Sequence, residues 1–77
     1  MNINLSELES MLDDAAALGD VEELKDIAWA LHNMASAASS RARAVEMRLE
    51  GDVECALSCE SNSEFALHRA HNRPAGC

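Results

Sequence analysis

The tetrapeptide GDVE occurs twice, at residues 19–22 and 51–54, and it decides how this chain folds. In each copy the glycine can adopt the left-handed backbone conformation that ends one helix, and the aspartate can cap the next helix. Glu23 lies three residues after Asp20 and completes a capping box. The two copies therefore predict two turns between helices, which divide the chain into three helical segments.

The composition favours helix along the whole chain. Alanine and leucine supply most of the apolar residues, Trp29 and Phe65 are the only aromatic residues, and Pro74 is the only proline. Alanine and leucine are strong helix formers with little preference for strands. We therefore predict an all-α protein, with a single helical domain over residues 1–72 and a frayed tail over residues 73–77.

The first two helices are predicted over residues 5–18 and 21–50, with Asn4 or Ser6 as the first cap. The first helix carries one apolar stripe at helical spacing, as expected of an amphipathic helix. The second is much longer, and its apolar band covers about half of its circumference, which is wide enough to contact two neighbours. The expected architecture is a helical hairpin with a long second helix, in a small three-helix bundle.

A seam of small residues runs along the second helix. The segment ASAASS, residues 35–40, has no side chain larger than serine, so another helix can approach it closely. The first helix is too short to cover the whole apolar band. We predict an antiparallel homodimer through this seam; in the alternative, the third segment covers the band. The seam residues are Leu31, Ala35, Ala38, Ala42 and Val45.

The third segment is poorly periodic if it forms a single helix. Val53 and Leu57 fall on one side, whereas Phe65 and Ala66 fall elsewhere. A break at residues 61–63 restores the pattern, with a serine cap at the start of the second piece. We therefore predict a short, broken third helix over residues 52–60 and 62–71.

The negative charge is concentrated at the start of the chain. Residues 1–26 contain eight acidic residues against Lys25 alone, so they carry −7 of the total charge of −8. Such a surface repels nucleic acid and anionic membranes and favours basic partners. The alternative is that these carboxylates only solvate the surface.

Trp29 is predicted to lie on the polar face of the second helix. A large aromatic residue beside acids is typical of a binding hot spot; in the alternative, the first helix covers it. We expect the partner to be a protein with a basic surface, and direct binding to nucleic acid or to a membrane is not expected. The predicted partner-binding residues are Trp29, Asp13, Asp14, Glu22, Glu23 and Asp26.

Two cysteines and two histidines raise the question of a zinc site. If the chain folded back at residues 61–63, Cys55 and Cys59 could meet His68 and His71 as a Cys2His2 site in a zinc-stapled regulator. The spacing departs from common zinc signatures, so packing of the cysteines as small apolar residues is favoured. We predict no metal and no cofactor.

The sequence carries no catalytic motif, and we predict that the protein is not an enzyme. Residues 1–4 lack the basic start and long apolar run expected of a signal peptide, and no apolar run reaches membrane-spanning length. Three cysteines, an odd number, argue against a secreted disulfide framework. A cytoplasmic protein is expected.

The overall profile, a strongly acidic helical chain of under 80 residues without a catalytic site, is similar to that of many phage-encoded inhibitors, including anti-CRISPR proteins. Some of these present carboxylates where a basic channel binds nucleic acid. The predicted function is such an inhibitor, active in a bacterial host cell; a helical dimerisation or adaptor module is the alternative.

Overall fold

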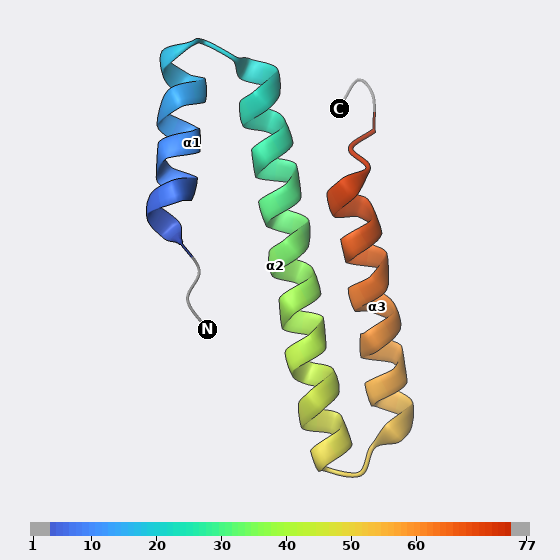
Figure 1. Ribbon diagram of the computed structural model, residues 1–77. Coiled ribbons are helices and arrows are strands. Elements are labelled where there is room, and N and C mark those ends of the chain that lie inside the picture. Colours follow the sequence, from blue (N-terminus) through green and yellow to red (C-terminus); the bar gives the residue numbers. More distant parts are fainter. Residues whose placement is uncertain (1–3, 75–77) are drawn as a thin grey trace.

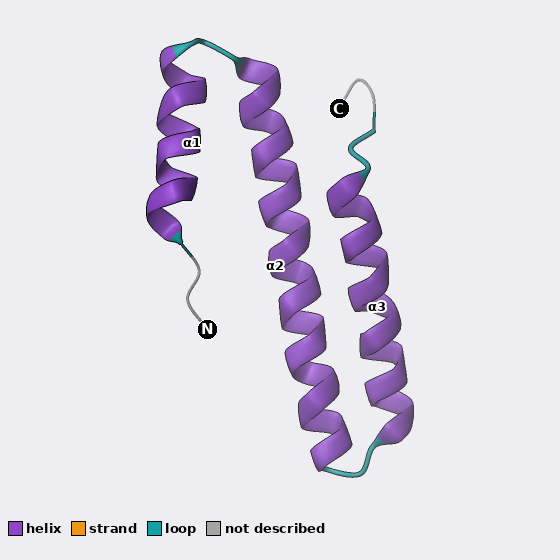
Figure 2. Ribbon diagram, in the orientation of Figure 1, coloured by secondary structure: helices purple, strands orange, loops and turns teal. Residues whose placement is uncertain are grey.

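The computed structural model describes residues 4–74 as three helices joined by two tight turns (Figures 1 and 2). The helices are α1 (Leu5–Ala17), α2 (Val21–Leu49) and α3 (Val53–His71). Each runs antiparallel to the one before it, and α2 lies between the other two (Figure 1). The described part of the chain contains no strand. The predicted all-α, three-helix architecture is confirmed.

The predicted helix starts are confirmed in atomic detail. The side chains of Asn4, Asp20 and Asp52 each accept a hydrogen bond from the backbone N–H three residues later, at 3.0–3.1 Å. Caps of this kind are each worth about 1 kcal/mol. Gly19 and Gly51 have φ values of 67° and 84°, the left-handed conformation predicted for both copies of GDVE.

Small side chains form the interface between α2 and α3. On both helices the interface positions alternate three and four residues apart, as in a coiled coil. Ala37 and Ala44 are 3% exposed, and Ala56 and Ala66 are fully buried, so the two helices pack closely. The buried or half-buried positions of this interface are Ala30, Asn33, Ala37, Ser40, Ala44 and Met47 on α2, and Ala56, Cys59, Ser63, Ala66 and Ala70 on α3.

The predicted break at residues 61–63 is wrong, because α3 is one continuous helix of 19 residues. Ser63 is fully buried against α2, where its Oγ accepts a hydrogen bond of 3.1 Å from Nε of Arg41. The predicted break is based mainly on the positions of the large apolar residues, but Leu57 and Phe65 remain exposed in the structure. The small residues, which form a regular stripe of their own, are the ones that pack.

The three helices form a single layer. The chain measures 50 × 31 × 10 Å along its principal axes, and the shortest dimension is about one helix diameter. Its radius of gyration is 15.6 Å, whereas a compact chain of this length would have about 11.5 Å. The buried apolar residues among residues 4–74 are five alanines and Ile27. The layer therefore has a thin core and leaves much apolar surface exposed.

Helix α1 covers only part of α2. It has 13 residues against 29 in α2, and it lies beside the N-terminal half of α2 (Figure 1). Ala15 and Ile27 are buried where the two helices meet. Beyond the end of α1, from about residue 35 to residue 49, α2 has a described neighbour only on the side of α3.

Candidate interaction surfaces

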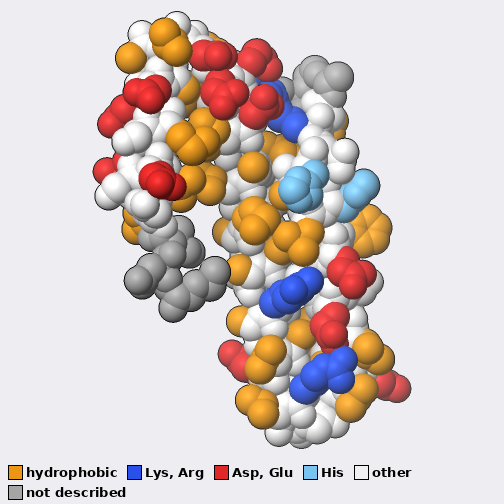
Figure 3. All heavy atoms as spheres, viewed as in Figure 1, with side chains coloured by type: hydrophobic (Ala, Val, Ile, Leu, Met, Phe, Trp, Pro, Cys, Tyr) orange, Lys and Arg blue, Asp and Glu red, His pale blue; other side chains and the backbone are white. Residues whose placement is uncertain are grey.

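The residues of the predicted seam lie on the side of α2 that faces away from α3, and most of them lie beyond the end of α1 (Figure 1). Leu31 and Val45 are 40% and 59% exposed, and the three alanines between them are exposed as well. Met34 and Leu49 extend the same stripe. In Figure 3, hydrophobic side chains are seen along α2 and at its borders with both neighbours. We call this surface the apolar band; it comprises Leu31, Met34, Ala35, Ala38, Ala42, Val45 and Leu49.

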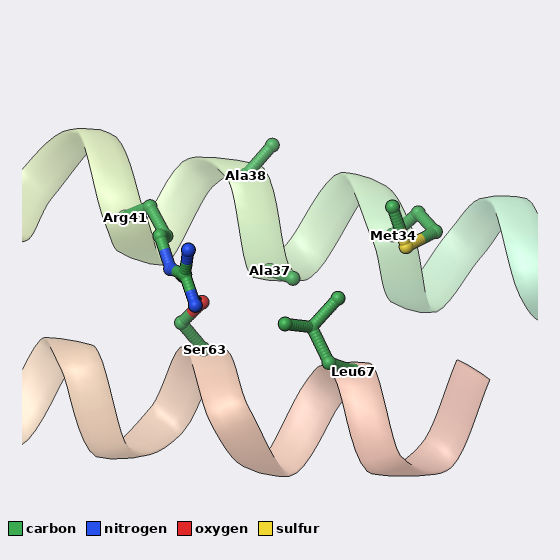
Figure 4. A pocket seen from close by; sticks show the side chains of 6 residues that line it. All are labelled: Met34, Ala37, Ala38, Arg41, Ser63 and Leu67. Carbon is green, nitrogen blue, oxygen red and sulfur yellow. Dashed lines mark hydrogen bonds between the residues drawn. The ribbon is translucent and has the colours of Figure 1, made fainter. Parts of the chain in front are cut away.

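The apolar band and the contact with α3 are separate stripes of one helix. Ala37 faces α3 and is buried, whereas the next residue, Ala38, points away from α3 (Figure 4). The alternative in which the third segment covers the apolar residues of the second helix holds only in part: α3 covers Ala37 and Ala44 but leaves the seam residues exposed. Helix α3 packs on another part of the circumference. The stripe that α1 covers at Leu24 and Ile27 continues at helical spacing into the band.

Two shallow grooves lie between the band and α3. Met34, Ala38, Arg41 and Leu67 help to line the first, which has a volume of about 340 Å³ (Figure 4). The second, of about 220 Å³, adjoins it at Arg41. There the guanidinium group of Arg48 binds the carboxylate of Glu60 across the helices. The edge of the band that faces α3 is thus apolar at Met34, Ala38 and Leu67 and polar from Arg41 to Arg48.

Trp29 is half-buried against α3 and does not stand on a free polar face. Its Nε1 donates a hydrogen bond to the backbone carbonyl of Arg69. Asn33, 3% exposed, donates to the carbonyl of Trp29 at 2.9 Å and accepts a hydrogen bond of 3.1 Å from Nε of Arg69. Trp29 borders a groove with Lys25 and His32 of the predicted polar face, but the helix that partly covers it is α3 and not α1. Its role in binding a partner stays a prediction.

The predicted acidic surface divides into two groups. Glu22 and Asp26 bind Nη1 of Arg73 at 3.2 and 2.6 Å, so these carboxylates already have a cationic partner. The side chain of Arg73 is only 15% exposed, which contradicts the prediction that residue 73 frays. These ion pairs favour the charged guanidinium, and the pKa of Arg73 is raised above its usual value. The remaining predicted tail residues from 75 onward, including Cys77, lie outside the described residues.

The other predicted carboxylates are available to a partner. Asp13, Asp14 and Glu23 are exposed and form no ion pair within residues 4–74. They lie near the turn between α1 and α2, where acidic side chains gather at one end of the molecule (Figure 3).

The proposed Cys2His2 arrangement does not occur. Cys59 and His68 are nine residues apart on one continuous helix, which separates them by about 14 Å along its axis. Within residues 4–74 no group of three or more cysteine, histidine or acidic residues is placed to hold a metal ion. Cys55 and Cys59 are half-buried free thiols, and partial burial together with Cys59 raises the pKa of the Cys55 thiol.

Comparison with protein-family models, with curated proteins and with solved structures finds no match to this chain. None of the described helices is both long enough and apolar enough to cross a membrane.

Proposed function

We propose that this protein is a non-enzymatic binding module whose apolar band packs against a helical surface of a protein partner. One observation carries the proposal: the helices form a single layer in which the larger side chains of the band are 40–84% exposed. An extended exposed apolar surface is characteristic of interaction sites. In this function α1 and α3 hold α2 in place, and the second half of α2 makes the contact.

The shape of the band fits a helix better than a flat surface. The middle of the band has the short side chains of Ala35, Ala38 and Ala42, and the larger side chains of Val45 and Leu49 follow them. The residues are spaced three and four apart, so side chains of a partner helix can enter between them. The partner class is therefore a protein with an exposed amphipathic helix.

Capture from an extract of the source cells tests this function. The tagged chain is compared with Val45→Glu, which places a charge in the band, and with Ser58→Glu, which adds the same charge at an exposed position of α3. In 0.5 M NaCl the wild type and Ser58→Glu should retain a protein that Val45→Glu loses, since salt screens charges and leaves apolar contacts intact. Equal retention by all three proteins would contradict the proposal.

A second candidate function uses the acidic end. The exposed Asp13, Asp14 and Glu23 at the turn between α1 and α2 support an inhibitor, anti-CRISPR-like and phage-encoded, that blocks a basic nucleic-acid-binding surface of its target. Changing these three residues to lysine leaves the carboxylates that hold Arg73 in place. This variant should lose the target, and binding by the wild type should weaken steeply between 0.05 and 0.5 M NaCl. If neither the lysine substitutions nor the added salt weakens binding, the acidic end is not the binding site.

A further inference from the structure

We infer that the apolar band is occupied by a second copy of this chain, packed antiparallel along residues 35–49 of α2 and centred on Ala42. The inference rests on the proposed function, since it names the partner of the same surface.

The chain exposes enough surplus area for a stable dimer. Its accessible surface is 5850 Å², whereas a compact monomer of 8.3 kDa would expose about 4,600 Å². The surplus is about 1,300 Å² per chain. An interface of standard size takes about 800 Å² from each partner. A contact along the band, with the side chains beside it, lies within this surplus.

The thin core favours a copy of the chain over an unrelated partner. Apart from Ile27, the buried apolar residues of the described chain are all alanines, and each contributes little apolar area. Chains of this size commonly gain the rest of their stability from a metal, a disulfide or a second subunit. If the fold needs a partner to bury the apolar band, that partner must be present wherever the chain is made. A second copy of the chain always meets this condition.

The position of α1 selects the antiparallel orientation. Helix α1 lies against the stripe of α2 that continues into the band, beside the first half of α2 (Figure 1). In a parallel pair, α2 of the second copy would run through the space that α1 occupies. In an antiparallel pair only the free halves overlap. This orientation also places the two N-terminal segments, each with a charge of −7, at opposite ends, well beyond the screening length of about 10 Å.

The order of side chains in the band is self-complementary in this register. With Ala42 at the two-fold axis, Ala35 of one copy lies opposite Leu49 of the other, and Ala38 lies within one residue of the level of Val45. Each larger side chain thus meets an alanine, which is the alternation that lets facing helices interdigitate. The contact is isologous and closes at two copies.

Sedimentation equilibrium of the full chain, with Ala42→Glu and Ser58→Glu, tests the dimer. The wild type and Ser58→Glu should have the mass of two chains. Ala42→Glu brings two carboxylates together at the axis and should weaken association by about a hundredfold or more. The thermal midpoint of the wild type should also rise with concentration. A wild-type mass of one chain, a midpoint independent of concentration, or a dimer untouched by Ala42→Glu would overturn the inference.

Disulfide trapping tests the orientation and does not depend on the stability of Ala42→Glu. Ala35→Cys and Leu49→Cys proteins are mixed, oxidised and mapped by mass spectrometry, which separates the new bond from any bond of the native cysteines. An antiparallel pair should give a 35–49 disulfide between chains. Bonds of 35 to 35 and 49 to 49 alone would refute this orientation.

The inference and the proposed function can fail separately. If the chain is monomeric but the wild type captures a protein that Val45→Glu does not retain, a second copy is excluded as the partner. The proposed function as a binding module is then still supported. If the chain is monomeric and Val45→Glu retains everything, both are excluded.

Discussion

The close contact of α2 with α3 can be tested by enlarging one buried alanine. Ala37 is 3% exposed and lies in the interface between the two helices, so Ala37→Leu places extra methyl and methylene groups where α3 already packs. Overpacking costs about 1–3 kcal/mol, and the shallow groove that Ala37 also borders favours the lower part of this range. For a domain of this size, each kcal/mol lowers the thermal midpoint by about 4–8 °C. The expected loss is therefore about 5–20 °C.

Ala28→Leu is the matched control, since it makes the same change at an exposed position of the same helix. Alanine and leucine differ little in helix propensity, so this variant should stay within about 0.5 kcal/mol of the wild type. Urea unfolding of all three proteins, followed by circular dichroism at one chain concentration, gives the two differences in unfolding free energy. If Ala37→Leu loses no more stability than Ala28→Leu, the close packing of α2 on α3 is wrong.

Three further outcomes are expected. Trp29→Phe keeps the aromatic ring but removes the hydrogen bond to Arg69, so it should lower the unfolding free energy by about 1 kcal/mol in urea; no loss would leave Trp29 without a structural role. Gly51→Ala should cost about 1 kcal/mol in the same assay, because φ is 84° while nothing lies within 4 Å of an added Cβ; an unchanged midpoint would contradict the turn. The raised pKa of Cys55 should move the pH midpoint of its alkylation upward in the folded chain relative to the chain in urea, as measured by mass spectrometry; coincident midpoints would count against the raised pKa.

The turns and caps were predictable from the sequence because local chemistry determines them. Glycine is the residue that adopts positive φ without strain, and an aspartate directly after it can accept the N–H groups of a new helix. Both copies of GDVE form this arrangement, at Gly19 and at Gly51. The starts of α2 and α3 lie within one residue of the predictions for the same reason.

The continuous third helix was missed because its packing depends on alanine and serine. A search for large apolar residues finds Val53 and Leu57 on one face of the helix and Phe65 on another, and all three remain exposed. The signal that was present is the stripe of small residues at positions 56, 59, 63, 66 and 70, alternating three and four apart. The same stripe would have placed α3 beside Trp29. No local sequence pattern predicts the ion pairs of Arg73, because they join residues that are distant in sequence.

Neighbouring alanines on α2 have different roles because successive residues of a helix point about 100° apart. Ala37 is enclosed by α3, and Ala38 belongs to the band that we propose as the dimer contact. Since the two stripes share no residue, a charge at Ala42 acts on association and leaves the hairpin of α2 and α3 intact, whereas a larger side chain at Ala37 acts on the hairpin directly. The two substitutions therefore act on different contacts of one helix. Ala42→Glu lowers stability only through loss of the second copy, whereas Ala37→Leu acts on the packing within one chain.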